Sequence, residues 1–328
     1  MKRVALTAIL LALAISVGVN QTSARTAAQA GSDLLQVLPD GNAVIVIDVH
    51  RVTTSNLWAT ISAQAKVKSQ IDKAQAEISE LGVKLADIQT VALVFPLGDK
   101  DNPTVAVSGG FDQNDLLSRM RSNEKIHLTS EKYKNFEIFK AESVATPSND
   151  QSKDNKPRKK DDGAFVFYDA KTAVIGSDAA VRASIDTKLG SRPSVAQNAK
   201  LTEAIAQNPG AAIRFAMEFT SSMASGLQSS QMPLPDFASV KLIFGSVDVV
   251  SGLDLVATLR NDTAEHAKNM SDRLNGLLEM VRGYLGAAND PKTAPLVGAL
   301  KSVSVTGSDV DVKITGNLPM EVFAQILK

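Results

Sequence analysis

The sequence predicts an α+β protein with two similar lobes of antiparallel sheet, each with helices packed on it. Residues 86–120 and 235–270 repeat one order: an acid, an apolar strand, a turn, a second apolar strand, and an acid that opens a helix. The strands within each copy are joined by short connections, which favours antiparallel hairpins over a parallel sheet with crossover helices. A chain of 328 residues with 44% apolar content also has room for about two domains.

The first 30 residues have the three parts of an export signal. Lys2 and Arg3 precede an apolar run at 4–19, and Ala28-Gln29-Ala30 follows as an A-x-A cleavage site. Cleavage after Ala24 is one alternative. An uncleaved membrane anchor is another, although the run is shorter than the ~20 residues of a spanning helix. The chain has no cysteine, which excludes lipid attachment at a cleavage-site cysteine, disulfides and thiolate chemistry. We expect a periplasmic or secreted protein with no membrane span after signal cleavage.

The charge balance argues against a nucleic-acid partner. The chain has 35 basic and 35 acidic residues, and removal of Lys2, Arg3 and Arg25 with the signal leaves 32 basic residues, a net charge of −3. A mildly acidic protein has no long-range attraction for phosphate backbones. Aromatic residues make up only 5% of the chain, which is few for base stacking.

The first lobe begins with an apolar, β-branched run at 43–47, which predicts a strand buried on both faces. Residues 56–81 then change to a helical period, and Gly82 is a plausible stop, so we expect one long amphipathic helix. A hairpin with arms at 89–95 and 104–109 follows. Its turn region, 96–103, is rich in turn-forming residues.

Asp112, with Asp115 three residues later, predicts the start of a short helix that ends near Asn123. Further strands are expected at 125–129, 136–140, 164–168 and 172–175, and a helix from Ser177-Asp178 to about Leu189. Residues 144–162 carry nine charges and two prolines with almost no apolar side chain, which predicts a mobile loop.

The second lobe repeats these elements. A strand at 212–219 matches 43–50, and a hairpin at 302–306 and 310–315 repeats 164–175 at an offset of 140 residues. Asp262, with Glu265 three residues later, predicts the start of a long helix that ends at Gly286. One face of that helix is apolar along its length, at Ala267, Met270, Leu274, Leu277, Leu278, Val281 and Leu285. We therefore divide the chain into a signal peptide (1–30), a first repeat (31–190), a boundary segment (191–210) and a second repeat (211–328).

Two short motifs flank predicted strands: one precedes the strand at 43–47, and the other covers the end of the strand at 104–109. They are Leu38-Pro39-Asp40 and Val107-Ser108-Gly109-Gly110-Phe111-Asp112. With them, the whole-chain pattern resembles an exported bacterial family known as a domain of unknown function. The resemblance implies export and no particular activity.

Asp48 and His50 are the residues most compatible with catalysis. They are two apart at the end of a predicted strand, so their side chains should point to one face as a carboxylate beside an imidazole. The alternative is a polar pair that ends a buried strand. Met217 and Phe219 occupy the corresponding places in the second copy, so the pair is not part of the shared scaffold. No G-x-S-x-G motif accompanies it.

Other chemical motifs are weak. Ser122 and Lys125 satisfy S-x-x-K, but no K-T-G follows. The three histidines, His50, His127 and His266, lie far apart in the sequence, and no phosphate-binding glycine motif occurs. We assign no catalytic, metal-binding or cofactor-binding residue, and we expect no cofactor.

These observations favour a non-enzymatic exported protein that binds another envelope protein or assembles with itself. One alternative is a carrier of an apolar ligand such as a lipid, since Ile213, Phe215, Met217 and Phe219 lie on one strand face, with Met223 and Leu227 after them. Alternation along a strand more often marks a core face. A second alternative is a hydrolase that uses Asp48 and His50.

Overall fold

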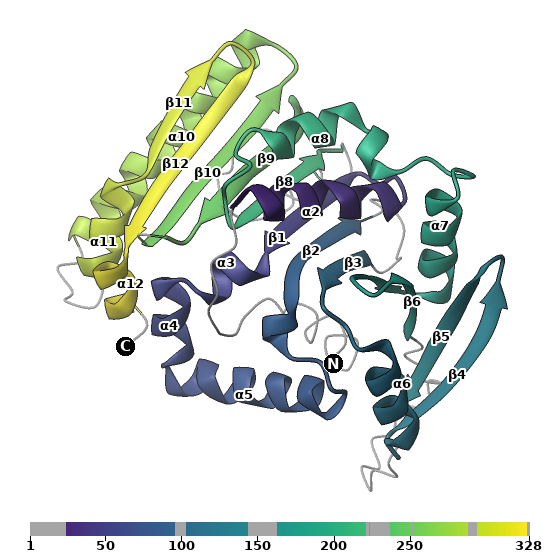
Figure 1. The fold of residues 1–328 in the computed structure, drawn as a ribbon. Coiled ribbons are helices and arrows are strands. Elements are labelled where there is room, and N and C mark those ends of the chain that lie inside the picture. The colour runs from purple at the N-terminus through teal and green to yellow at the C-terminus, as the bar shows by residue number, and fades with distance from the viewer. Residues whose placement is uncertain are drawn as a thin grey trace, which may run out of the picture. The chain divides into compact units, whose positions relative to one another are not determined.

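The computed structural model describes residues 24–95, 103–143, 163–220, 223, 237–250, 252–287 and 294–326. The chain divides into two compact units. Unit 1 comprises residues 1–41 and 69–197, and unit 2 comprises 42–68 and 198–328. Figure 1 shows the strands and helices of both units. The expected α+β class is confirmed, because each unit contains an antiparallel sheet covered by helices.

The described residues of unit 1 form six strands in the order β2-β3-β7-β6-β5-β4. They span Ile88–Phe95 (β2), Thr104–Gly109 (β3), Ile126–Tyr133 (β4), Phe136–Ser143 (β5), Gly163–Asp169 (β6) and Thr172–Gly176 (β7). The helices α2 (Ala24–Val37) and α7 (Asp178–Lys188) pack on this sheet, and α6 (Gln113–Ser122) packs against β4. The 3-10 turns Leu85–Asp87 and Val195–Gln197 and most of α5 (Ala65–Glu80) complete the unit.

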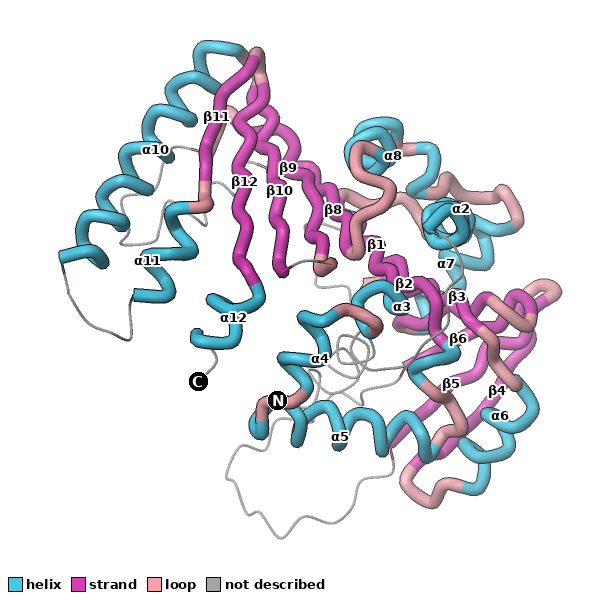
Figure 2. The backbone as a smooth tube through the Cα atoms, turned by 60° about the vertical axis from the view of Figure 1, so that its left-hand side comes forward, coloured by secondary structure: helices cyan, strands magenta, loops and turns pink. Residues whose placement is uncertain are grey.

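In the part of unit 2 that the structure describes, six strands follow the order β11-β12-β10-β9-β8-β1. They span Ala43–Asp48 (β1), Ile213–Glu218 (β8), Val240–Asp248 (β9), Gly252–Asn261 (β10), Ser304–Ser308 (β11) and Asp311–Pro319 (β12). Its helices are α3 (Val49–Thr53), α4 (Asn56–Ser62), α8 (Ala199–Ala206), α10 (Ala264–Ala287), α11 (Ala294–Lys301) and α12 (Met320–Ile326). Figure 2 shows α10 along one side of strands β9 to β12 and α8 on the other side, next to β8.

The strand order agrees with a duplicated scaffold. Strands β2-β3-β7-β6 of unit 1 and β9-β10-β12-β11 of unit 2 follow the same sequence of hairpins and the same neighbour relations. The two strands that precede these hairpins in the repeats, β1 and β8, pair with each other in antiparallel register from Ala43↔Met217 to Ile47↔Ile213. Because of this pairing, residues 42–68 pack with unit 2, whereas the sequence places them in the first repeat. The change between units at 197–198 lies inside the predicted boundary segment 191–210.

The predicted helix at 56–81 is interrupted. It forms α4, ending at Ser62, and α5, beginning at Ala65. Ile71, Ala74 and Ile78 are buried on α5, while Leu57 and Trp58 are the buried residues of α4. The sequence pattern of one continuous apolar face is therefore divided between two helices, each with buried residues of its own.

Local capping signals predict two helix starts correctly. The Asp112 carboxylate accepts from the amide of Asp115 at 3.0 Å, and the Ser177 hydroxyl accepts from the amide of Ala180 at 3.2 Å. The long helix α10 starts one residue later than predicted. The Thr263 hydroxyl, and not the Asp262 carboxylate, accepts from the amide of His266 at 3.2 Å.

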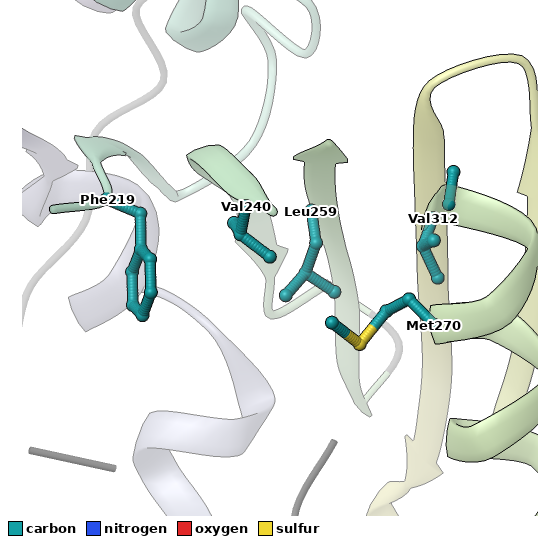
Figure 3. Packing of buried hydrophobic residues seen from close by; sticks show 6 residues of the cluster. Phe219, Val240, Leu259, Met270 and Val312 are labelled. Carbon is teal, nitrogen blue, oxygen red and sulfur yellow. The ribbon is translucent and has the colours of Figure 1, made fainter. Parts of the chain in front are cut away.

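The core of unit 2 lies between α10 and the sheet. Figure 3 shows Met270 of α10 beside Leu259 of β10 and Val312 of β12, with Phe219 and Val240 in the same cluster. Ala267 completes the cluster, and all six residues are buried. Only the first half of α10 takes part, since its buried residues are Ala267, Met270 and Ser271.

Several predictions concern segments outside the described residues. They are the apolar run of the signal, most of the first hairpin turn, the loop 144–162 and Leu227. The proposed cleavage site at 28–30 lies within α2. Among the described helices, none is both long enough and apolar enough to cross a membrane.

Candidate functional site

The predicted pairing of Asp48 and His50 on one strand face is wrong. The strand β1 ends at Asp48, and His50 lies on the short helix α3. The Asp48 carboxylate is the N-cap of this helix and accepts from the amide of Arg51 at 2.9 Å. Residues two apart share a face only within a strand, so the prediction does not hold once the chain turns into a helix after Asp48. The Asp48 carboxylate therefore caps the helix on which His50 lies.

The S-x-x-K residues have structural contacts of their own. The Ser122 hydroxyl donates to the carbonyl of Ser118 at 2.8 Å, within α6. Lys125 forms an exposed ion pair with Glu80 at 3.9 Å. Within the described ranges, no group of three His, Cys, Asp or Glu residues could hold a metal ion.

A different carboxylate–imidazole pair occurs at the start of α10. The Nδ1 of His266 lies 2.6 Å from the carboxylate of Asp262, and this hydrogen bond holds the pKa of Asp262 below its usual range. Ser239 lines the same cavity of about 280 Å³. The spacing of four residues on a helix is the sequence signal that could have found the pair. However, the Ser239 hydroxyl donates to Asn261 Oδ1 at 2.9 Å, and both members of the pair are solvent-exposed, as in a surface ion pair.

The apolar strand face that suggested a ligand carrier is part of the core. Phe219 belongs to the buried cluster of unit 2, and Met217 and Met223 pack against it. Phe215 lies against Gly245 of β9, where an added Cβ would be 2.9 Å from the phenyl ring. These side chains therefore fill space within the unit.

The opposite face of the unit 2 sheet carries an open cleft of about 530 Å³ beside the end of α8. Its lining combines apolar residues such as Phe244 and Val256 with the charged residues Asp309, Asp311 and Lys313. Next to it on β8, Arg214 is only 8% exposed, and its Nε has no hydrogen-bond partner among the described residues. Burial lowers the pKa of Arg214, and the charge of Asp48 opposes that effect. Because the lining holds charges of both signs, it does not select a ligand of one charge.

The most unusual surface of unit 2 lies on the second half of α10 and on α11. Four large apolar side chains are exposed there, and we call them the α10–α11 surface: Met280, Val281, Tyr284 and Leu296. Tyr284 is 77% exposed and Met280 is 57% exposed. These residues account for four of the six large exposed apolar side chains among the described residues. The sequence predicts an apolar face along all of α10, but no residue of the helix beyond Ser271 is buried.

Arg282 fixes α11 against this part of α10. Its Nε donates to the carbonyl of Leu300 at 3.1 Å, and one terminal nitrogen donates to the carbonyls of Leu300 at 2.7 Å and Val303 at 2.6 Å. Its other terminal nitrogen pairs with Glu279 at 2.5 Å. The Leu300 carbonyl also accepts from the amide of Val303 at 3.2 Å, so the Arg282 guanidinium adds to the hydrogen bonding just where α11 ends. The two helices therefore present their exposed side chains on a fixed support.

The chain has structural matches but no match to a protein family or a curated protein. Two solved structures are similar over most of the chain, both at 11% sequence identity. One is described as the structure of crystal form I of TP0453, with a TM-score of 0.44 over 90% of this chain and 95% of that chain. The other is crystal form IV of TP0453, with a TM-score of 0.46 over 92% of this chain and 98% of that chain.

Proposed function

We propose that this is an exported, non-enzymatic protein that binds a protein partner through the α10–α11 surface. One observation carries the proposal: Tyr284 and Met280 are more than half exposed on α10, the helix to which Arg282 fixes α11. Apolar side chains gathered on a surface mark interaction sites, and tyrosine and methionine are enriched in protein interfaces. Export rests on the signal pattern of residues 1–30.

Rigid aromatic side chains also suit this role energetically. A tyrosine buries a large area on binding and loses little conformational freedom, because only two side-chain torsions become fixed. Here the helix already fixes the backbone of Tyr284 in the free protein. A partner that covers Tyr284 and Met280 therefore gains apolar burial without ordering a segment of this chain.

A photo-crosslinking amino acid at position 284 tests the proposal in intact cells. We expect it to trap a defined partner, while the same probe at Glu265, an exposed position on the first turn of α10, traps none. The captured protein is then purified and titrated with the full-length protein. Binding should saturate and should weaken at least tenfold in Tyr284→Ala, because central aromatic residues contribute about 2 kcal/mol or more to interfaces. Equal binding by wild type and Tyr284→Ala would contradict the proposal.

A further inference from the structure

The exposed stripe of α10 is complementary to itself. Gly276, Met280 and Tyr284 follow one another at intervals of four residues, so they lie on one side of the helix. Tyr284 and Met280 project from this stripe, while a Cβ added at Gly276 would meet nothing within 4 Å. The stripe thus has a bulky residue and an empty position at equal distances on either side of Met280.

We infer that the partner of this surface is a second copy of the chain, bound through antiparallel pairing of the two α10 helices about Met280. In such a pair, each residue faces the partner's residue at the same distance on the other side of Met280. The ring of Tyr284 is then seated on Gly276 of the second copy, and the same contact recurs by symmetry. Leu277 adds to the apolar contact from the neighbouring stripe.

Charge complementarity supports this arrangement. Arg273 lies seven residues before Met280, and Ala287, the last residue of α10, lies seven residues after it. In the antiparallel pair, Arg273 therefore reaches the C-terminal end of the other helix. The negative end of a helix dipole and its unpaired carbonyls favour a cation at that place. Arg273 has no ion pair or hydrogen bond among the described residues, so pairing would displace none of those contacts.

The size of the contact sets its strength. Stable interfaces bury about 1,200–2,000 Å² in total, and one helix pair lies at the low end of that range. We therefore expect a reversible dimer with a Kd of about 1–100 µM. This inference rests on the proposed function, since it names the partner of the same surface.

Sedimentation of the mature protein over a concentration series, from about 1 to 300 µM, measures the association directly. We expect a monomer–dimer equilibrium in the wild type and a monomer throughout in Gly276→Leu. Leucine fills the space that Tyr284 of the second copy needs, yet it has room in the single chain and favours the helix. The melting temperature of the dilute variant should therefore stay the same or rise. A dimer that persists in folded Gly276→Leu would show that another surface pairs.

Cysteine trapping locates the symmetry axis, because the natural chain has no cysteine. Only a residue on the axis meets its own copy, so Met280→Cys should form a disulfide dimer rapidly under mild oxidation. Asn269→Cys is the matched control: it lies on the same side of the helix, but its two copies would be about 33 Å apart at 1.5 Å of rise per residue. We expect at least a tenfold difference in the rate of dimer formation.

The outcomes separate the two proposals. A wild-type monomer at every concentration, with Met280→Cys no faster than Asn269→Cys, would overturn self-pairing. If the crosslinker at position 284 then captures a different protein that binds saturably, the proposed function stands with another partner. If it captures none, both proposals fail.

Discussion

Removal of the Arg282 guanidinium should release α11 while the rest of unit 2 stays folded. Three hydrogen bonds from Arg282 reach the carbonyls of Leu300 and Val303 at 2.6–3.1 Å. Hydrogen bonds from a charged donor contribute about 1.5–3 kcal/mol each. The guanidinium is only partly buried, and water can hydrate the freed carbonyls, so we expect a net loss of about 2 kcal/mol in Arg282→Met.

Amide hydrogen exchange measures this local opening. A loss of about 2 kcal/mol corresponds to about 30-fold faster exchange. We expect this change at residues 296–303 and no change in β9 or β10, at a concentration where the protein is monomeric. Arg273→Met is the control, since Arg273 lies on the same helix and has no hydrogen bond or ion pair among the described residues. Equal exchange of 296–303 in wild type and Arg282→Met would refute the claim that Arg282 holds α11.

Three further predictions concern other parts of the chain. Gly245→Ala should destabilise unit 2 by about 3 kcal/mol in chemical denaturation, because the new Cβ would lie 2.0 Å from the carbonyl oxygen of Val256 in the paired strand; a change below 1 kcal/mol would contradict this. The hydrogen bond from Lys134 holds the pKa of Asp186 below its usual range, so its stabilisation is present above pH ~4 and is lost as the pH falls through the folded-state pKa. Asp186→Asn should therefore be less stable than wild type at neutral pH, and the two should converge in acid; a constant difference at all pH values would disprove the linkage. Asp48→Asn keeps an oxygen that can cap α3, so it should be more stable than Asp48→Ala, which should lose about 1 kcal/mol with the helix cap; equal melting temperatures of the two variants would contradict the cap.

The parts of the fold that the sequence predicts well are those that local chemistry determines. The helix starts after Asp112 and Ser177 were predictable because each side chain binds an amide three residues later. The repeated hairpins were predictable because adjacent strands joined by short turns pair with each other. Neither inference needs knowledge of distant contacts.

Pairing between distant segments was beyond the sequence pattern. The strand β1 pairs with β8, which lies about 170 residues later in the chain, and that contact moves residues 42–68 into unit 2. The prediction that Asp48 and His50 lie on one strand was wrong for a local reason: the strand ends at Asp48 and a helix begins. An aspartate at the end of an apolar run reads equally well as a strand residue or as an N-cap, and Arg51 provides the amide that decides it.

The candidate surface could not be found from periodicity, because the apolar stripe of α10 continues unchanged from Ala267 to Leu285. Burial differs along it because the sheet covers the first half, while Arg282 ties the second half to α11. The glycines add an independent signal. Gly276 and Gly283 lie inside a continuous helix with open space at their Cβ positions, where alanine would be more stable by about 1 kcal/mol each. In a single chain, nothing among the described residues offsets the lower helix stability that these glycines cause. In the proposed antiparallel pair, Gly276 receives Tyr284 and Gly283 receives Leu277, so the same two positions allow the helices to approach closely.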